Sequence, residues 1–168
     1  KTKPIKDLLE AYNAGQKIFG ENKIQEMVSK WELMPKDIKW HMIGHVQTNK
    51  VKYMAPFVDF IHAVDSIKLL KEIQKQAEKN NRHIKCLIQI RIAQEETKFG
   101  ITPDELELLL DTSKSFNNVL IEGLMGMASF TEDKNQIRRE FQLLKSIYDK
   151  YSSFKILSMG MSGDYNIA

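Results

Sequence analysis

Short apolar segments alternate with longer amphipathic segments along the whole chain. The short segments hold about five to eight residues, and several are rich in Ile, Val or Phe, which indicates buried strands. In the longer segments apolar residues recur every three or four positions, as Ile67, Leu70 and Ile73 do, which predicts helices. We predict strands at 17–21, 39–43, 60–64, 85–92, 120–127 and 155–161, and helices at 4–14, 23–33, 47–55, 67–80, 103–115 and 134–151.

Local start and stop signals agree with this pattern. Thr102 followed by Pro103 is typical of a helix start, and Asp65-Ser66 precedes the fourth predicted helix. Gly15 follows the first helix and Asn80-Asn81 ends the fourth. The chain therefore reads as a regular α/β alternation without repeats or linkers, and we expect one domain over residues 1–168.

Strict alternation of this kind predicts a parallel sheet covered by helices. Two architectures compete, an open doubly wound sheet and a TIM (β/α)8 barrel. A Gly-rich dinucleotide fingerprint is missing after every predicted strand, which favours the barrel. A barrel usually takes about 250 residues, so this chain would hold about six of the eight units.

Composition narrows the class of protein. The chain has 168 residues, 42% hydrophobic and 28% charged, as in ordinary globular domains. A net charge of +3 with interspersed signs argues against nucleic-acid binding. The single cysteine, Cys86, cannot form an internal disulfide, no apolar run reaches the about 20 residues that span a bilayer, and the start lacks a hydrophobic signal region. We expect a cytoplasmic protein that does not enter a membrane.

Candidate chemistry gathers where the predicted strands end, because barrel active sites lie at the C-terminal ends of the strands. Many of these residues are polar or basic and favour an anionic ligand. They are Lys1, Glu21-Asn22, Gly44-His45, Asp65, Arg91, Met127-Ala128 and Met161-Ser162.

Lys1 is the candidate nucleophile. A deprotonated lysine amine attacks an aldehyde, and burial or a nearby cation such as Lys3 favours deprotonation. The alternative is a solvated lysine at a chain end.

The segment 160–164 follows the last predicted strand and is expected to open a helix. Its backbone N–H groups, with the Ser162 hydroxyl, could hold a phosphate, although Ser162 could equally serve as an N-cap. Asp164 counts against phosphate, because its carboxylate would repel the anion.

Other polar residues are ambiguous. Arg91 alternates with Leu87 and Gln89 and so faces a barrel mouth, unless it pairs with Glu95 or Glu96. His41 and His45 would lie about 13 Å apart on a strand, so we expect no metal site. His62 and His83 indicate nothing on their own. The alternating residues Met125, Met127, Met159 and Met161 are interpreted as core filling.

Seven short motifs, in order along the chain, resemble the pyridoxal 5′-phosphate (PLP) homeostasis protein family. They are Lys-Thr-Lys-Pro at 1–4, Ala-Gly-Gln at 14–16, Phe-Gly-Glu-Asn at 19–22, Trp-His-Met-Ile-Gly-His-Val-Gln-Thr-Asn-Lys at 40–50, Glu-Thr-Lys-Phe-Gly at 96–100, Gly-Leu-Met-Gly-Met at 123–127 and Leu-Ser-Met-Gly-Met-Ser at 157–162.

This resemblance implies an alanine-racemase-like barrel of the fold-type III PLP class. Lys1 matches the lysine that holds PLP as a Schiff base, and Asn22, Met161 and Ser162 match positions of the cofactor pocket, with the Met161-Ser162 turn near the phosphate. Family members bind and buffer the cofactor without an established reaction. PLP-dependent apoenzymes are the partners that such a carrier would serve, and we expect a monomer.

The chain departs from the family pattern in three places. The strand expected before Lys1 and the final βα unit expected after Ala168 are missing, so we expect a barrel that is incomplete at both ends. Many relatives carry asparagine where Arg91 stands, so the resemblance does not define the polar contacts of this cofactor-pocket candidate.

Three alternatives remain beside a PLP carrier. A PLP-dependent racemase would need a second acid or base, for which Tyr12, Tyr53 and Tyr165 qualify only by residue type. A barrel could instead bind a phosphorylated ligand without covalent chemistry. An interaction module is the third, but no exposed apolar stripe favours it.

Overall fold

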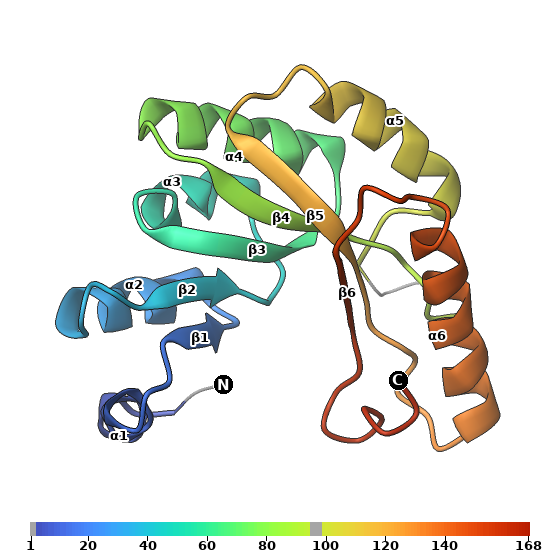
Figure 1. The fold of residues 1–168 in the computed structure, drawn as a ribbon, viewed down its shortest axis with the longest axis horizontal. Coiled ribbons are helices and arrows are strands. Elements are labelled where there is room, and N and C mark those ends of the chain that lie inside the picture. Colours follow the sequence, from blue (N-terminus) through green and yellow to red (C-terminus); the bar gives the residue numbers. More distant parts are fainter. Residues whose placement is uncertain (1–2, 95–98) are drawn as a thin grey trace.

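The computed structural model describes residues 3–94 and 99–168. Six strands and the helices between them alternate along this part of the chain (Figure 1). The strands are β1 (Ile18–Glu21), β2 (Lys39–Met42), β3 (Val58–Val64), β4 (Ile84–Gln89), β5 (Val119–Gly126) and β6 (Ile156–Met159). The helices are α1 (Ile5–Asn13), α2 (Ile24–Leu33), the 3₁₀ turn η1 (Thr48–Lys50), α3 (Val51–Met54), α4 (Ile67–Lys79), α5 (Pro103–Ser113) and α6 (Lys134–Tyr148).

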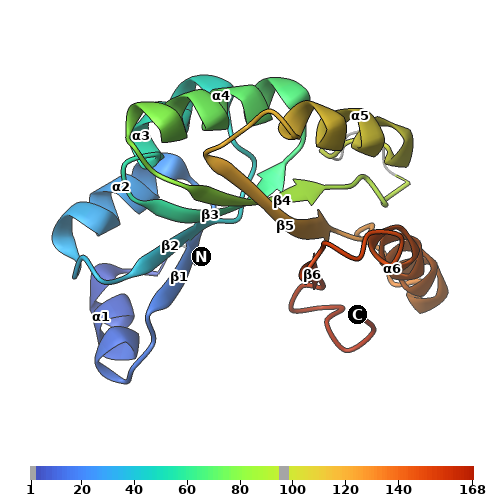
Figure 2. The ribbon, with the colours of Figure 1, turned by 45° about the horizontal axis from the view of Figure 1, so that its top comes forward.

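The sheet has the topology of a barrel wall. All five pairings are parallel and the strand order is β1-β2-β3-β4-β5-β6, with no reversal. The helices cover the outer, convex face of the curled sheet (Figures 1 and 2). A doubly wound sheet would reverse its strand order and carry helices on both faces, so the barrel prediction is confirmed as a six-stranded half-barrel.

The predicted helix signals act as expected. The Ser66 side chain accepts a hydrogen bond from the Leu69 backbone N–H at 3.2 Å at the start of α4. Thr102 and Glu105 form a capping box at the start of α5. Each helix then buries an apolar stripe against the sheet; α4, for example, buries Leu69, Leu70, Ile73 and Ala77.

The main core fills the space between helices and sheet. Trp40, Met42, Ile61, Ile88 and Leu124 point to this convex side and are fully buried. The concave side has a separate, smaller apolar cluster of Phe60, Ala63, Leu87 and Met125. Strand residues thus divide between two faces, and the concave face is the one available to a ligand.

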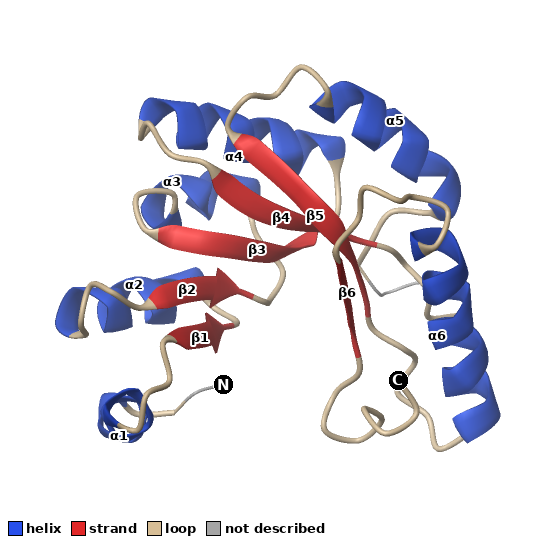
Figure 3. Ribbon diagram, in the orientation of Figure 1, coloured by secondary structure: helices blue, strands red, loops and turns tan. Residues whose placement is uncertain are grey.

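Several predicted boundaries differ from the structure by one to three residues, and three elements differ as follows (Figure 3). The helix predicted at 47–55 is split into η1 and α3. β4 ends at Gln89, and the next residue, Ile90, forms an isolated bridge to Ile101. β6 ends at Met159, because Gly160 adopts a φ of 90° that an extended strand excludes.

A buried ion pair joins the end of β1 to α2. Lys30 Nζ donates to Glu21 Oε1, and the side chains are only 10% and 3% exposed. The pair fixes the end of β1 and therefore the position of the next residue, Asn22. Among the described residues, no helix is long and apolar enough to cross a membrane.

Candidate functional site

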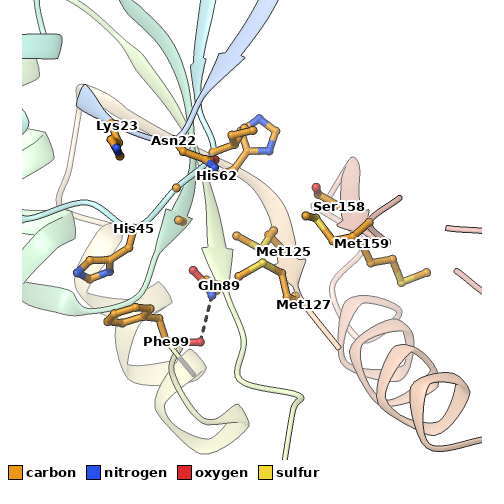
Figure 4. A pocket seen from close by; sticks show the side chains of 16 residues that line it. Asn22, Lys23, His45, His62, Gln89, Phe99, Met125, Met127, Ser158 and Met159 are labelled. Carbon is orange, nitrogen blue, oxygen red and sulfur yellow. Dashed lines mark hydrogen bonds between the residues drawn. The ribbon is translucent and has the colours of Figure 1, made fainter. Parts of the chain in front are cut away.

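A pocket of about 580 Å³ opens on the concave face at the C-terminal ends of the strands (Figure 4). Its walls combine a soft apolar side with a few polar groups. They include Asn22, Gly44, His45, His62, Gln89, Phe99, Met125, Met127, Ser158, Met159 and Met161. This volume and mixture are typical of small-molecule sites, which measure about 300–1,000 Å³.

The loops after β1 and β2 meet closely at one side of the pocket. A Cβ atom at Gly44 would lie 2.3 Å from the Asn22 backbone oxygen, a distance that no side chain tolerates. Only glycine therefore lets the two loops approach, and this approach holds Asn22 at the pocket wall.

His45 and Phe99 form another part of the wall. Their rings stack at 3.8 Å between centroids, and His45 Nδ1 lies 2.9 Å from Asp65 Oδ2. Gln89 Nε2 donates to the Phe99 carbonyl at 3.1 Å (Figure 4). These contacts tie the loop at Phe99 to the ends of β2, β3 and β4.

An irregularity in β3 places two consecutive residues on the pocket side. Ile61 and Val64 are three residues apart on β3, whereas their partners on β4 are two apart. The extra residue interrupts the alternation of side chains, so His62 and Ala63 both line the pocket.

His62 continues inward to a second histidine. His41 Nδ1 and His62 Nε2 are 3.0 Å apart, and His41 Nε2 lies 3.9 Å from Asp59 Oδ2. Burial, followed by the charge of His41, lowers the pKa of His62 to about 4. Burial is also the main cause that lowers the pKa of His41, with Asp59 opposing it. Both rings are therefore neutral at pH 7.

The methionines form the opposite wall. Met125 is buried, as the core-filling interpretation expected, and belongs to the concave apolar cluster. Met127, Met159 and Met161 line the pocket as well, and Met161 is 44% exposed. Flexible thioether side chains of this kind adapt to the shape of a flat ligand.

Of the predicted site residues, Asn22 and Met161 come together at the pocket. Ser162 follows Met161 but is exposed and is not among the lining residues. Lys1 lies outside the described residues. Glu95 and Glu96, the alternative partners of Arg91, lie outside them too.

Arg91 stands apart from the pocket walls. It is exposed in the loop after β4, because the strand ends at Gln89 and the alternation with Leu87 stops there. The pKa of Glu105 is lowered mainly by hydrogen bonds from Thr102, and the nearby Arg91 guanidinium adds a smaller effect. Arg91 thus lies near the start of α5.

The segment 160–164 forms turns where a helix was expected. The Asp164 carboxylate accepts the Met161 backbone N–H, and Tyr165 N–H donates to the Met161 carbonyl at 2.9 Å. The Asp164 carboxylate therefore closes this turn, and the N-cap considered for Ser162 does not form, because the described residues 160–168 contain no helix. The carboxylate also occupies the Met161 backbone N–H, one of the donors that the sequence analysis considered for a phosphate.

The site contains residues that the sequence analysis passed over. His62 was dismissed as isolated, although it lies one strand away from His41. The missing signal was the extra residue in β3, which no periodicity reveals. No group of three His, Cys, Asp or Glu side chains within residues 3–94 and 99–168 is arranged to hold a metal ion.

The volume of the pocket and its polar and apolar lining residues fit PLP. The cofactor needs an elongated space with apolar walls for its ring and a few polar groups for its ring substituents and phosphate. Asn22, His45, His62, Gln89 and Ser158 supply such groups, and the methionines supply the apolar wall.

Residues 5–167 match the family model described as alanine racemase, N-terminal domain. The pyridoxal phosphate homeostasis protein of Aquifex aeolicus is 40% identical over 174 residues, covering 100% of this chain and 76% of that protein. The protein of the same name from Helicobacter pylori is 35% identical, covering 94% of this chain and 72% of that protein.

Solved structures agree. PipY of Synechococcus elongatus, solved with PLP bound, is 30% identical with a TM-score of 0.86, covering 100% of this chain and 82% of that one. An alanine racemase of Clostridium difficile shares the fold at 9% identity and a TM-score of 0.77, covering 95% of this chain and 43% of that one. This chain therefore belongs to the alanine racemase N-terminal domain family and, within it, to the pyridoxal phosphate homeostasis proteins.

Proposed function

We propose that this chain binds PLP in the pocket on the concave face and acts as a carrier or buffer of the cofactor. The supporting observation is a pocket of about 580 Å³ at the C-terminal strand ends of a chain that aligns over its full length with the PLP-bound form of PipY. Barrel proteins bind ligands at this end of the strands. One domain over residues 1–168 performs this role.

In this proposal Lys1 holds PLP as a Schiff base, while Asn22, Met161 and Ser162 contact the cofactor. A Schiff base is reversible, which suits storage and transfer. The cofactor supplies reactivity, and the protein supplies binding and orientation. Arg91 acts on the cofactor only if its loop turns toward the pocket, since its side chain is exposed beside α5.

Borohydride reduction tests the covalent attachment. The protein is mixed with PLP, reduced and digested, and the peptides are weighed by mass spectrometry. We expect the added mass on Lys1. The matched control is Lys3→Ala, which should leave the adduct in place, whereas Lys1→Ala should remove it. An adduct spread over several surface lysines would contradict the assignment to Lys1.

A carrier is favoured over a racemase because the candidate tyrosines are in unsuitable places. None of Tyr12, Tyr53 and Tyr165 is among the lining residues of the pocket. The Tyr12 hydroxyl instead donates to Asp37 at 2.7 Å, in the loop that precedes β2. Exchange of the alanine α-proton with solvent deuterium, faster than with free PLP, would reverse this preference.

The cellular setting follows from the same proposal. We place the protein in the cytoplasm, as a monomer that supplies PLP to apoenzymes. Cys86 is fully buried, and burial raises the pKa of its thiol, so this cysteine is not available for disulfide exchange. Size-exclusion chromatography with light scattering tests the monomer, and reactivation of a PLP-free apoenzyme by the loaded protein tests delivery.

A further inference from the structure

Three polar side chains cross the concave face from the N-terminal end of β3 to the pocket. Asp59 lies near the start of β3, His41 lies on the neighbouring strand β2, and His62 lines the pocket. The two links are 3.9 Å, from Asp59 Oδ2 to His41 Nε2, and 3.0 Å, from His41 Nδ1 to His62 Nε2.

The backbone of β3 is adapted to this arrangement. Val58 and Phe60 are two residues apart, whereas their partners on β2 are adjacent, so Asp59 is an extra residue in the ladder. A second extra residue occurs at His62 and Ala63 against β4. Such irregularities redirect side chains next to functional sites. In β3, one irregularity lies at Asp59 and the other at His62, and both residues belong to the Asp59–His41–His62 series.

The carboxylate fixes where the histidine protons lie. A negative charge beside His41 Nε2 favours the neutral ring form that carries its proton on that nitrogen. His41 Nδ1 is then a hydrogen-bond acceptor, so the proton between the rings belongs to His62 Nε2. A neutral imidazole carries one proton only, which leaves His62 Nδ1 unprotonated.

We propose that Asp59 and His41 are positioning residues that hold His62 as a neutral ring with an unprotonated Nδ1, so that the pocket presents a fixed hydrogen-bond acceptor. The ligand group that suits this acceptor is an O–H or N–H donor, such as a phenol, a protonated ring nitrogen or an amine. A phosphate oxygen does not suit it. The arrangement thus gives the pocket one position that suits donor groups.

Burial is the main cause that keeps the histidine pair neutral, and the nearby charges act in both directions. Lys39 on β2 and Lys85 on β4 both disfavour a proton on His41, and Asp59 on β3 favours one. β1 places only Gly20 opposite His41. Phe60 contacts both rings, at 5.2 Å and 4.7 Å between centroids, and shields them from water. An additional proton on either ring is therefore disfavoured mainly by burial, and on His41 also by the two lysines, against the favourable effect of Asp59.

Nitrogen-15 NMR of the cofactor-free protein tests the proposal directly. Long-range ¹H–¹⁵N correlation distinguishes protonated from unprotonated ring nitrogens, and the His62 signals are assigned by their loss in His62→Gln. At pH 7 we expect Nδ1 of His62 unprotonated and Nε2 protonated. A His62 ring that is protonated at Nδ1 and unprotonated at Nε2 in the unmodified chain would overturn the proposal, and this result would not depend on any variant.

Variants then test the role of the carboxylate. Asp59→Asn should shift the His62 Nδ1 signal toward the protonated form, and Asp59→Glu should restore it. The matched control is Asp65→Asn, which removes the carboxylate beside the other pocket histidine, His45, and should leave the His62 signals in place. An unchanged His62 tautomer in Asp59→Asn would refute the positioning role. Because PLP is absent, these results are independent of the proposed cofactor binding.

Discussion

The Glu21–Lys30 ion pair shows how one contact supports both fold and site. Burial of both groups means that each charge depends on the other, and Glu21 Oε2 has no hydrogen-bond partner among the described residues. A buried pair contributes little net stability compared with apolar residues, but losing one partner is costly. The pair holds the end of β1, so its loss also disturbs Asn22.

Lys30→Met should destabilise the chain by about 3–5 kcal/mol, because the Glu21 carboxylate is then buried without a counter-charge. Urea unfolding followed by circular dichroism measures this change. The double variant Glu21→Leu/Lys30→Met should recover most of the loss. An equal loss in the single and double variants would mean that packing, not charge, dominates at this position.

His62 makes stability depend on pH. Its pKa is lowered to about 4 in the folded chain from an ordinary value of 6.5. Between these values the unfolded chain binds a proton that the folded chain does not, so the free energy of unfolding falls as the pH falls from 6.5 toward 4. We expect this residue to account for about 2 kcal/mol of that fall, allowing for partial exposure.

Urea unfolding at pH 7 and at the acid end of this range measures the fall. His62→Gln should show a smaller loss than the unmodified chain, whereas substitution of the exposed His83 by Gln should leave the loss unchanged. His41 contributes in the same direction, because its pKa is lowered too. Identical pH dependence in His62→Gln and the unmodified chain would rule out His62 as a source.

At the scale of elements, the pairing of β5 with β6 depends on one glycine. Gly123 pairs with Ile156, and a Cβ at this position would lie 1.9 Å from the Ile156 carbonyl oxygen. β6 carries Ser158 and Met159 of the pocket wall. The close approach of the two strands therefore determines one side of the site.

Gly123→Ala should destabilise the chain by well over about 1 kcal/mol, because the added methyl group collides with backbone that cannot move without breaking the pairing. Gly163→Ala is the matched control, since nothing lies within 4 Å of its added Cβ. Hydrogen exchange should show loss of protection in β6 for Gly123→Ala only. Protected β6 amides in both variants would contradict this explanation.

Periodicity was sufficient to predict the elements and their parallel order, because every helix has one apolar stripe and every strand is short and apolar. It could not predict where strands become irregular. The extra residues at Asp59 and His62 give no signal in the hydrophobic pattern of β3. They nevertheless determine which side chains of the strand face the pocket. Contacts such as His41 with His62 depend on register between strands, which a single chain does not reveal.

The sequence analysis likewise placed some candidate site residues at the pocket and misplaced another. Asn22 and Met161 follow strands, so the barrel rule was enough to place them. The prediction for Arg91 assumed that β4 continues to residue 92, but the strand ends at Gln89 and the side chain is exposed near the start of α5. The end of a strand is decided by packing of the following loop, which local sequence describes poorly.

For the whole molecule, binding of PLP to the folded chain should raise its stability. A ligand that binds only the folded state adds RT ln(1 + [L]/Kd), about 2.7 kcal/mol at a hundredfold excess over Kd. We expect thermal unfolding to shift upward with PLP concentration. Pyridoxal, which lacks the phosphate, should give a smaller shift, because it cannot use the polar groups that would hold an anion.

Lys1→Ala separates covalent from non-covalent binding in the same experiment. If the Schiff base contributes to affinity, the variant should need a higher PLP concentration for the same shift, while its response to pyridoxal falls to nearly nothing. Equal curves for the variant and the unmodified chain would indicate a phosphate-ligand barrel without covalent attachment. No shift with PLP in either protein would refute cofactor binding itself, because a pocket that holds the ligand must stabilise the half-barrel around it.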